Sequence, residues 1–427
     1  MKRDVRRLST RLVLSFVLAA TALPALAQEP SPPAIGAFAG VSLQAAQSAA
    51  LAHAPGVAAA QYRVEETQAA LAAARGLGAP QATLGYAQAP QGGTTSTITQ
   101  RLVTLGGQVT LGDYFRRDPF VRQAQSNLRA AQFDLQNAQR TERITIIGAY
   151  FKALQTAATV RLREAALRTA QADRNAAHKR YAAGEVPRLD VVRGDVAIAQ
   201  AQADLETARA DSENARSALA IQTGEPLAAF SGVVAAAPPS NAIPDNPQTA
   251  ARRAELLRPD VAAAQANVKA EAAAVRVASR GVLPSVVISG GYTTGVDSGI
   301  HVQGPSANVL VSLPVSHQSK DLIAEERARL AQTQAKLASV QQSVQIEVGA
   351  AVRSYDASVR ATAAATRARQ AAQSELHATE IGYRSGASSS LDLADARRTY
   401  DQAVVSELNA RYNQAQARAT LSVLIGE

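Results

Sequence analysis

The 427-residue sequence contains no cysteine, no tryptophan and a single methionine. The lack of cysteine excludes a disulfide framework, and it also excludes a lipid anchor on a cysteine at the start of a mature chain. Aromatic residues make up only 4% of the chain although hydrophobic residues reach 47%, because most of the apolar content is alanine, with valine and leucine. Alanine has the highest helix propensity and buries little area per residue, so we expect long, closely packed helices rather than a thick globular core.

Long apolar runs are also missing after Gln28, where no segment reaches the 18 consecutive apolar residues typical of a transmembrane helix. Residues 1–27, in contrast, have the features of a secretory signal peptide: a basic start, an apolar stretch over 12–22 and an Ala-Leu-Ala cleavage motif at 25–27. The alternative is a membrane anchor, for which the apolar stretch is short. The sequence therefore predicts export, with 1–27 as the signal peptide.

The chain also has only a small excess of positive over negative charge. The formal net charge is +9, and the predicted signal peptide contributes four of these net positive charges. Basic and acidic residues alternate along the chain, as in Glu325, Glu326, Arg327 and Arg329. This pattern is typical of solvated helix faces, so nucleic acid is not an expected partner.

The chain offers little material for catalysis or metal binding. It has five histidines, and no two of them lie three or four residues apart as in a helical metal site. A P-loop is missing too. We therefore expect no catalytic residues, no metal, no cofactor and no enzymatic activity, and any energy for transport would come from a partner.

What the sequence does contain is a tandem repeat. Residues 181–225 match residues 383–427 without a gap at an offset of 202, as the pair Tyr181 and Tyr383 illustrates. The fronts of the halves match at an offset of 204, as in Pro55 and Pro259. These matches divide the chain into a first repeat over 28–226, a linker over 227–245 and a second repeat over 246–427.

Both repeats show the same predicted order of elements. Each begins with a helix of about 30 residues (43–76 and 246–280), followed by two strands (81–88 with 96–111, and 285–294 with 307–315) separated by turn-rich segments. A very long helix follows, from Pro119 with Asp118 as its N-cap to residue 182, and over 320–384. A glycine turn (184–187 and 386–390) then leads into a return helix (190–222 and 392–424). Some 64 residues of helix form a rod of roughly 95 Å, which implies a coiled coil or a helical barrel, with the first helix covering the part of the rod that the return helix does not reach.

This order, given twice after a signal peptide, resembles the TolC family of outer-membrane efflux proteins, also called outer membrane factors. The motif Tyr-x-x-Gly-x-x-x-x-Leu-Asp at both predicted hairpin tips, over 181–190 and 383–392, carries the resemblance, which covers about residues 40–427. The resemblance implies a mostly α fold with a small β part. In it, a homotrimer builds a long α-helical barrel and a twelve-stranded membrane β-barrel, to which each chain gives four strands.

The resemblance also implies a gate at the hairpin tips. Asp392 and Asp395 match two aspartates that ring the periplasmic entrance, although acidic capping of a helix N-terminus is an alternative role. Tyr383 matches the tyrosine of a link that holds the entrance closed, with Asp190 as its acidic partner, although Tyr383 could instead be an anchor packed between helices. A second link in the family uses an arginine where this chain has Ser388, so we expect a closed state held less tightly or by other contacts.

The tip turns are also where the family meets the periplasmic adaptor of its pump. The matching positions here are Gly184, Val186, Gly386 and Ser388, although glycine at such a turn is equally explained by reversal of the backbone. The leading hypothesis is thus a trimeric outer-membrane channel, projecting into the periplasm of a Gram-negative bacterium. It would be the passive exit duct of a tripartite efflux pump or type I secretion system, with adaptor, inner-membrane pump and outer-membrane lipid as partners. The alternative is a soluble periplasmic coiled-coil scaffold or adaptor without a pore.

Overall fold

The structure is a computed structural model that describes residues 36–93, 96–235, 246–281, 283–297, 300–313 and 318–426. They belong to one compact unit, Ile35–Glu427. The predicted signal peptide lies outside the described residues. Within those residues, none of the helices combines the length and apolarity that a membrane span requires.

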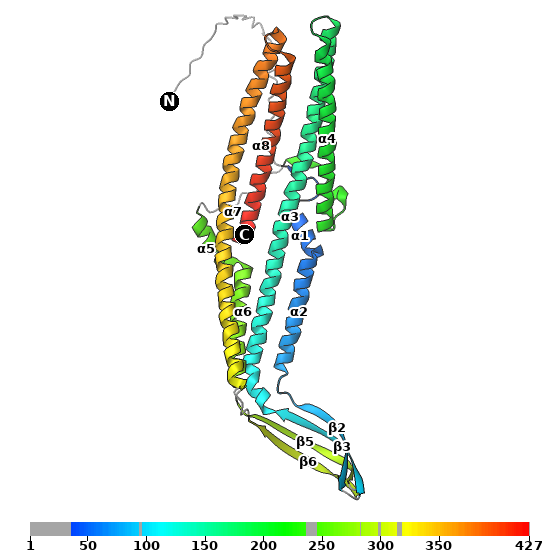
Figure 1. Ribbon diagram of the computed structural model, residues 1–427, viewed down its shortest axis with the longest axis vertical. Coiled ribbons are helices and arrows are strands. Elements are labelled where there is room, and N and C mark those ends of the chain that lie inside the picture. The colour runs from blue at the N-terminus through cyan, green and yellow to red at the C-terminus, as the bar shows by residue number, and fades with distance from the viewer. Residues whose placement is uncertain are drawn as a thin grey trace, which may run out of the picture. The chain divides into compact units, whose positions relative to one another are not determined.

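The helices follow the predicted order twice (Figure 1). Each repeat has two short helices, one very long helix and one return helix. In the first repeat they are α1 (Leu43–His53), α2 (Pro55–Arg75), α3 (Leu111–Ala182) and α4 (Arg188–Thr223). In the second they are α5 (Pro247–Leu257), α6 (Pro259–Arg280), α7 (Gln318–Ser385) and α8 (Ser390–Ile425). The mostly helical fold with a tandem repeat is therefore confirmed.

The predicted single helix at the front of each repeat is wrong, because each is broken in two. Pro55 and Pro259 begin the second helix of each pair, and the residues before them, Ala54 and Arg258, are extended with ψ of 118° and 129°. Proline lacks the N–H that would continue the preceding helix, and its ring disfavours helical ψ in the residue before it.

The predicted start of the first long helix, at Asp118 and Pro119, is also wrong. Helix α3 begins at Leu111 and runs through Pro119, while Asp118 forms an ion pair with Arg122 at 3.7 Å. The first turn of α3 packs closely against Ser285, since a Cβ on Gly112 would come within 2.7 Å of the Ser285 hydroxyl. A proline near the start of a long packed helix costs a backbone hydrogen bond without ending the helix.

The four predicted strands form one antiparallel sheet in the order β2-β3-β5-β6. They are β2 (Gln81–Gly93), β3 (Ser96–Thr110), β5 (Ser285–Asp297) and β6 (Ile300–Ser312). Most are longer than predicted, because the turn-rich segments are largely part of the ladders. Pro90 and Pro305 lie in β2 and β6, the two outer strands, where a missing N–H donor leaves the inner ladders intact. The central pair, β3 with β5, joins the two repeats.

The long helices hold the two repeats side by side (Figure 1). Helix α3 packs against α2 over its sheet-proximal part and against α4 over its tip-proximal part, and α7 packs likewise against α6 and α8. This end-to-end covering agrees with the expectation from the sequence. Helix α3 also contacts α6 and α8, so the second repeat lies directly beside the first.

The start of the predicted linker, residues 227–235, is an ordered part of the core. Its 3-10 turn, Leu227–Phe230, buries Phe230 against Phe38, and the strand β4 (Val233–Ala235) pairs with β1 (Gly36–Phe38). Tyr150 of α3 stacks edge-on with Phe38 at 5.5 Å and donates its hydroxyl proton to the carbonyl oxygen of Val41 at 3.0 Å. The rest of the linker, 236–245, lies outside the described residues.

Candidate gate at the hairpin tips

The two hairpins end in turns that require glycine for backbone reasons. Gly184 has φ +76° and Gly386 has φ +77°, and a Cβ at either position would meet no atom within 4 Å. The backbone conformation, and not space, therefore selects glycine there. Val186 and Ser388, beside these glycines, are both half-buried. The Ser388 N–H donates to the carbonyl oxygen of Gly382 at 3.1 Å, so Ser388 closes its own turn.

Asp190, at the start of α4, connects the first hairpin to the second. Its Oδ2 accepts a hydrogen bond from the Tyr383 hydroxyl of α7 at 3.4 Å, and its Oδ1 accepts one from the Ser390 hydroxyl of α8 at 2.6 Å. Arg193 donates to the same Ser390 hydroxyl at 2.6 Å and lies 3.8 Å from Asp190 Oδ1. The structure thus brings Tyr383 and Asp190 together within one chain. It adds two partners, Ser390 and Arg193, that the sequence did not indicate for this link.

Tyr383 is held as a neutral hydroxyl donor. Partial burial and the negative charge of Asp190 raise the pKa of Tyr383, while the nearby Arg180 opposes that shift. The guanidinium carbon of Arg180 lies 4.8 Å from the centre of the Tyr383 ring, in cation–π range, and Arg180 also pairs with Glu185 at 3.2 Å. Tyr383 is therefore held by Arg180 at its ring face and by Asp190 at its hydroxyl. Tyr181, the matching residue of the first repeat, is exposed instead.

Asp392 and Asp395 are both exposed at the start of α8, away from this link. Asp392 completes a capping box, since its Oδ2 accepts from the backbone N–H of Ser389 at 2.8 Å and the Ser389 hydroxyl accepts from the Asp392 N–H at 3.2 Å. The hydrogen bonds from Ser389 lower the pKa of Asp392. Asp395 pairs with Arg398 at 2.7 Å. The capping role considered for Asp392 is thus present, and both carboxylates face solvent.

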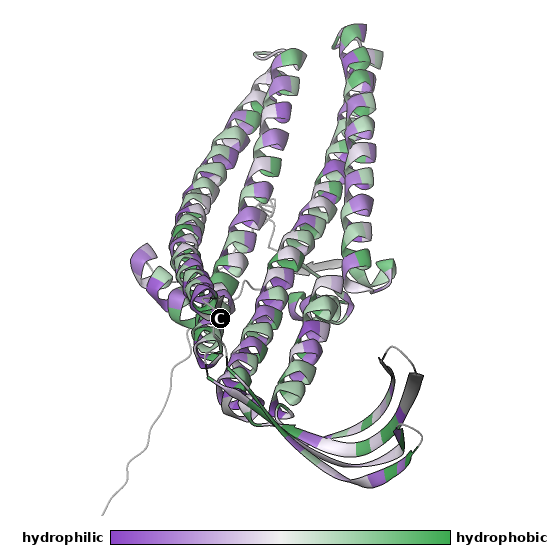
Figure 2. Ribbon diagram, turned by 60° about the horizontal axis from the view of Figure 1, so that its bottom comes forward, coloured by the Kyte–Doolittle hydropathy of each residue, from purple (hydrophilic) through white to green (hydrophobic). Residues whose placement is uncertain are grey.

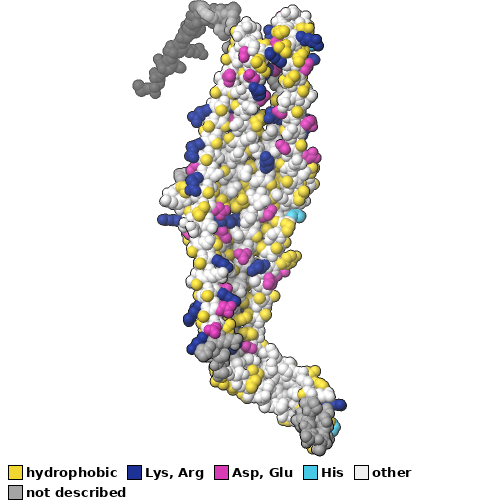
Figure 3. All heavy atoms as spheres, viewed as in Figure 1, with side chains coloured by type: hydrophobic (Ala, Val, Ile, Leu, Met, Phe, Trp, Pro, Cys, Tyr) yellow, Lys and Arg dark blue, Asp and Glu magenta, His cyan; other side chains and the backbone are white. Residues whose placement is uncertain are grey.

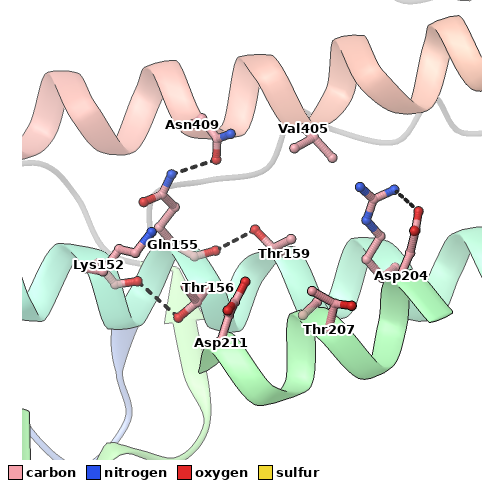
Figure 4. A pocket seen from close by; sticks show the side chains of 11 residues that line it. Lys152, Gln155, Thr156, Thr159, Asp204, Thr207, Asp211, Val405 and Asn409 are labelled. Carbon is pink, nitrogen blue, oxygen red and sulfur yellow. Dashed lines mark hydrogen bonds and ion pairs between the residues drawn. The ribbon is translucent and has the colours of Figure 1, made fainter. Parts of the chain in front are cut away.

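A polar cavity of about 280 Å³ lies below the tips, between α3, α4 and α8 (Figure 4). Gln155 of α3 donates to the amide oxygen of Asn409 on α8 at 2.7 Å, and Arg163 of α3 pairs with Asp204 of α4 at 3.2 Å. Three threonine hydroxyls complete much of the wall. The arrangement holds no nucleophile paired with a base, and its main polar contacts tie the repeats and the first hairpin together. Across the residues that the structure describes, no group of three or more histidine, aspartate or glutamate side chains is arranged to hold a metal ion.

Comparison with known proteins gives a family match over both repeats. The family model described as "Outer membrane efflux protein" matches residues 46–225 and 250–427. The cobalt-zinc-cadmium resistance protein CzcC of Cupriavidus metallidurans is 24% identical over 390 residues, which covers 90% of each chain. The pyoverdine export outer membrane protein OpmQ of Pseudomonas aeruginosa is 24% identical over 317 residues, covering 73% of this chain and 66% of OpmQ.

Solved structures share the fold. The outer-membrane channel OprN superposes with a TM-score of 0.75 at 21% identity, over 90% of this chain and 89% of OprN. The open state of the MtrE outer membrane channel of Neisseria gonorrhoeae gives a TM-score of 0.73 at 21% identity, over 93% of this chain and 96% of MtrE. At these identities the likeness concerns the fold alone.

Proposed function

This chain belongs to the outer membrane efflux protein family, and we propose that three copies of it form one export duct whose periplasmic end is gated at the hairpin tips. The protein is an efflux channel of the Gram-negative outer membrane that extends into the periplasm, and it is not an enzyme. Membership of this family favours the channel over the alternative of a soluble scaffold without a pore.

The observation that supports a trimer is the four-stranded sheet, whose two edges are unpaired within the described residues. Its outer strands, β2 and β6, each pair on one side only within the described residues. Large apolar side chains such as Leu84, Tyr86, Leu105 and Val309 are exposed on it. Figure 2 shows hydrophobic residues recurring along its strands. An open sheet edge is not tolerated in lipid, and a closed barrel removes it. Three sheets joined edge to edge form a closed twelve-stranded barrel in which every strand has two neighbours.

The gate rests on the contacts of the tips. In the closed duct, the link from Tyr383 to Asp190 holds the second hairpin against the first within each chain. The exposed Asp392 and Asp395 of three chains form a ring of carboxylates at the entrance, which favours cations. Since Ser388 stands where the family has the arginine of a second link, this gate is held less tightly or by other contacts, such as those of Ser390 and Arg193 with each other and with Asp190.

Replacing Asp392 and Asp395 together by asparagine should reduce the cation preference of the channel and weaken its block by multivalent cations. The reason is the loss of the charges that attract cations to the entrance, while asparagine at 392 can still cap α8. Reversal potentials in planar bilayers under a salt gradient measure the selectivity. Asp211→Asn, which removes an exposed carboxylate of α4 away from the tips, is the control. An unchanged reversal potential in the double variant would refute the aspartate ring.

Replacing Tyr383 by phenylalanine should raise the single-channel conductance or the open probability. The substitution keeps the ring and its contact with Arg180, and it removes the hydroxyl that donates to Asp190. A hydrogen bond to a charged acceptor contributes about 1.5–3 kcal/mol, so the ratio of closed to open channels would fall by about tenfold to a hundredfold. Tyr181→Phe in the first repeat is the matched control. If the two variants conduct alike and like the wild type, the link does not close the duct.

The tip turns with Gly184, Val186, Gly386 and Ser388 are the proposed contact for a periplasmic adaptor, which connects the duct to an inner-membrane pump. All four are exposed or half-buried at the ends of the hairpins. The relatives' names refer to different cargo, metal resistance for CzcC and pyoverdine for OpmQ. This spread agrees with cargo selection by the pump and not by the duct.

A further inference from the structure

The contact between the two repeats of one chain supplies a template for the contact between chains. Helices lie in the order α4, α3, α8 and α7, so α3 meets α8 in the interior while α4 and α7 are left as the outer edges (Figure 1). In the tandem repeat, α7 is the counterpart of α3, and α4 is the counterpart of α8. The contact that corresponds to α3 with α8 is therefore α7 of one copy with α4 of another. A head-to-tail interface of this kind generates a ring when the rotation between copies closes, as it does in the proposed trimer.

The register of this template is set by two observations. Gln155 of α3 bonds to Asn409 of α8, and a Cβ on Gly148 would lie 3.7 Å from the side-chain amide nitrogen of Gln416. Both pairs fit one antiparallel alignment. The repeat offset of 202, seen in Tyr181 and Tyr383, converts this alignment into one between chains. Adding 202 to the number of an α3 residue gives its counterpart on α7, and subtracting 202 from the number of an α8 residue gives its counterpart on α4 of the next copy.

Within the chain, part of this contact is apolar, beside the polar pair Gln155 and Asn409. Phe151 and Ala158 of α3 pack in one hydrophobic cluster with Leu408 and Ala415 of α8. We call these four residues the apolar seam. Their counterparts 202 residues away are charged: Arg353 and Arg360 on α7 replace the first pair, and Glu206 and Glu213 on α4 replace the second.

The charged counterparts form two exposed stripes. The basic stripe is Arg353, Arg360 and Arg367, and the acidic stripe is Glu206 and Glu213, all of them exposed. A spacing of seven residues is close to two helical turns, so each stripe follows one face of its helix. In the described part of the chain, neither Glu213 nor the three arginines form an ion pair within 4 Å, while Glu206 pairs only with the exposed Arg209 of its own helix. Figure 3 shows basic side chains in a row along the α7 edge and acidic side chains along the opposite, α4 edge.

We propose that the basic stripe of one copy docks on the acidic stripe of the next, so that ionic seams between chains alternate with apolar seams within chains around the duct. The alignment sets Arg360 within reach of Glu206, and Arg353 within reach of Glu213. The occupant of each edge is a second copy, because the two stripes have opposite charge, the same spacing and matching positions. Charge complementarity of this kind sets partner choice and register, and like charges at the same place oppose assembly. This inference rests on the proposed trimer.

Charge reversal tests the docking in the full-length protein. Arg353→Glu with Arg360→Glu should reduce the trimer recovered from outer membranes by about tenfold or more, since like charges then face each other. Glu206→Arg with Glu213→Arg should do the same, and the four substitutions combined should restore the trimer. Arg168→Glu, at an exposed arginine of the interior helix α3, is the control and should assemble normally.

Cross-linking provides an independent measurement, helped by the absence of natural cysteine. A chain with Arg360→Cys and Glu206→Cys should form covalent dimers and trimers on treatment with a short thiol cross-linker, because residues 360 and 206 lie on opposite edges of one chain. A chain with Arg168→Cys and Glu206→Cys should not. If trimers form but are indifferent to charge reversal and give no such cross-link, the docking is overturned and the trimer stands. If the wild-type protein forms no trimer, both fail.

Discussion

Replacing Arg258 by methionine should lower the free energy of unfolding by about 4 kcal/mol, in the range found when one partner of a buried ion pair is removed. Arg258 is only 4% exposed at the break between α5 and α6, and it is the centre of a cluster that joins three helices. Its guanidinium bonds to Asp260 of α6 at 2.7 Å and to Glu347 of α7 at 2.6 Å. Arg140 of α3 lies 3.6 Å from Asp260 and connects the cluster to the first repeat.

The reason for this large effect is the carboxylates that methionine would leave behind. Burial alone would lower the pKa of Arg258, but its hydrogen bonds to Asp260 and Glu347 raise it. The same contacts lower the pKa of Asp260 against the opposing effect of its own burial. Without Arg258, Asp260 keeps only the more distant Arg140, and Glu347 loses its partner.

Thermal unfolding followed by helical circular dichroism measures the loss. Arg252→Met, at an exposed arginine of the neighbouring α5, is the control and should change stability by less than about 0.5 kcal/mol. Adding Asp260→Asn to Arg258→Met should recover part of the loss, because it removes the charge of the more buried of the two carboxylates. If the double variant recovers no stability, or if Arg258→Met is as stable as Arg252→Met, the buried ion pairs of Arg258 do not stabilise the fold as described.

Replacing Glu407 by leucine should destabilise the second hairpin by about 3 kcal/mol, although leucine is what the first repeat has at the matching position, Leu205. Glu407 is fully buried on α8. Its oxygens lie 2.6 Å from Arg369 and 2.7 Å from Arg411, and it accepts a hydrogen bond from Thr366 at 2.8 Å. Leucine would leave two mostly buried arginines without their shared carboxylate.

The first repeat indicates which second substitution should restore stability. Leu167 stands there where the second repeat has Arg369, so Glu407→Leu combined with Arg369→Leu installs the apolar pair of the first hairpin in the second. This double variant should recover part of the stability lost by Glu407→Leu alone, because it removes one of the two arginines that lose their carboxylate, while Arg411 remains. Equal stability losses in the single and double variants would show that the arginine charges are not the cause.

The same cluster predicts an acid-sensitive step. Burial would raise the pKa of Glu407, but the hydrogen bond from Thr366 and the charges of Arg411 and Arg369 outweigh it, and the pKa is lowered. A carboxylate whose pKa is lowered by folding contributes stability above its unfolded pKa, about 4.3, and loses it as the pH falls through the folded value. Glu407→Gln should therefore be less stable than the wild type at neutral pH, with a difference that shrinks below about pH 4.

The order of elements could be predicted because alanine-rich periodicity, glycine turns and the repeat itself are local signals. The breaks at Pro55 and Pro259 had a local signal, the prolines themselves, whereas other boundaries failed where pairing or packing overrides a local signal. Pro119 has the sequence context of a helix start, but α3 begins earlier, where Gly112 packs against Ser285. Pro90 lies in a turn-like sequence, but pairing with β3 extends the strand through it.

At the tips, the pairing of Tyr383 with Asp190 was anticipated from the family resemblance, while the contacts of Ser390 and Arg180 were not. A serine hydroxyl or an arginine beside a tyrosine ring gives no pattern that distinguishes it from a solvated residue. The buried clusters around Arg258 and Glu407 were missed for a related reason, because alternating charges on a long helix look alike whether they face water or a neighbouring helix. The mismatch of Leu205 with Glu407 is the one sequence signal that could have indicated a buried charge.

The pairing of β1 with β4 bears on the order in which the chain can fold during synthesis and export. Gly36–Phe38 has no strand partner until Val233–Ala235 has emerged, by which time the whole α3–α4 hairpin is available. Phe38 can therefore settle against Tyr150 and Phe230 only after the first repeat has been delivered in full. A chain that pauses before Val233–Ala235 has emerged would leave this aromatic cluster incomplete and exposed to chaperones and proteases, which gives quality control a stage at which to recognise an unfinished molecule.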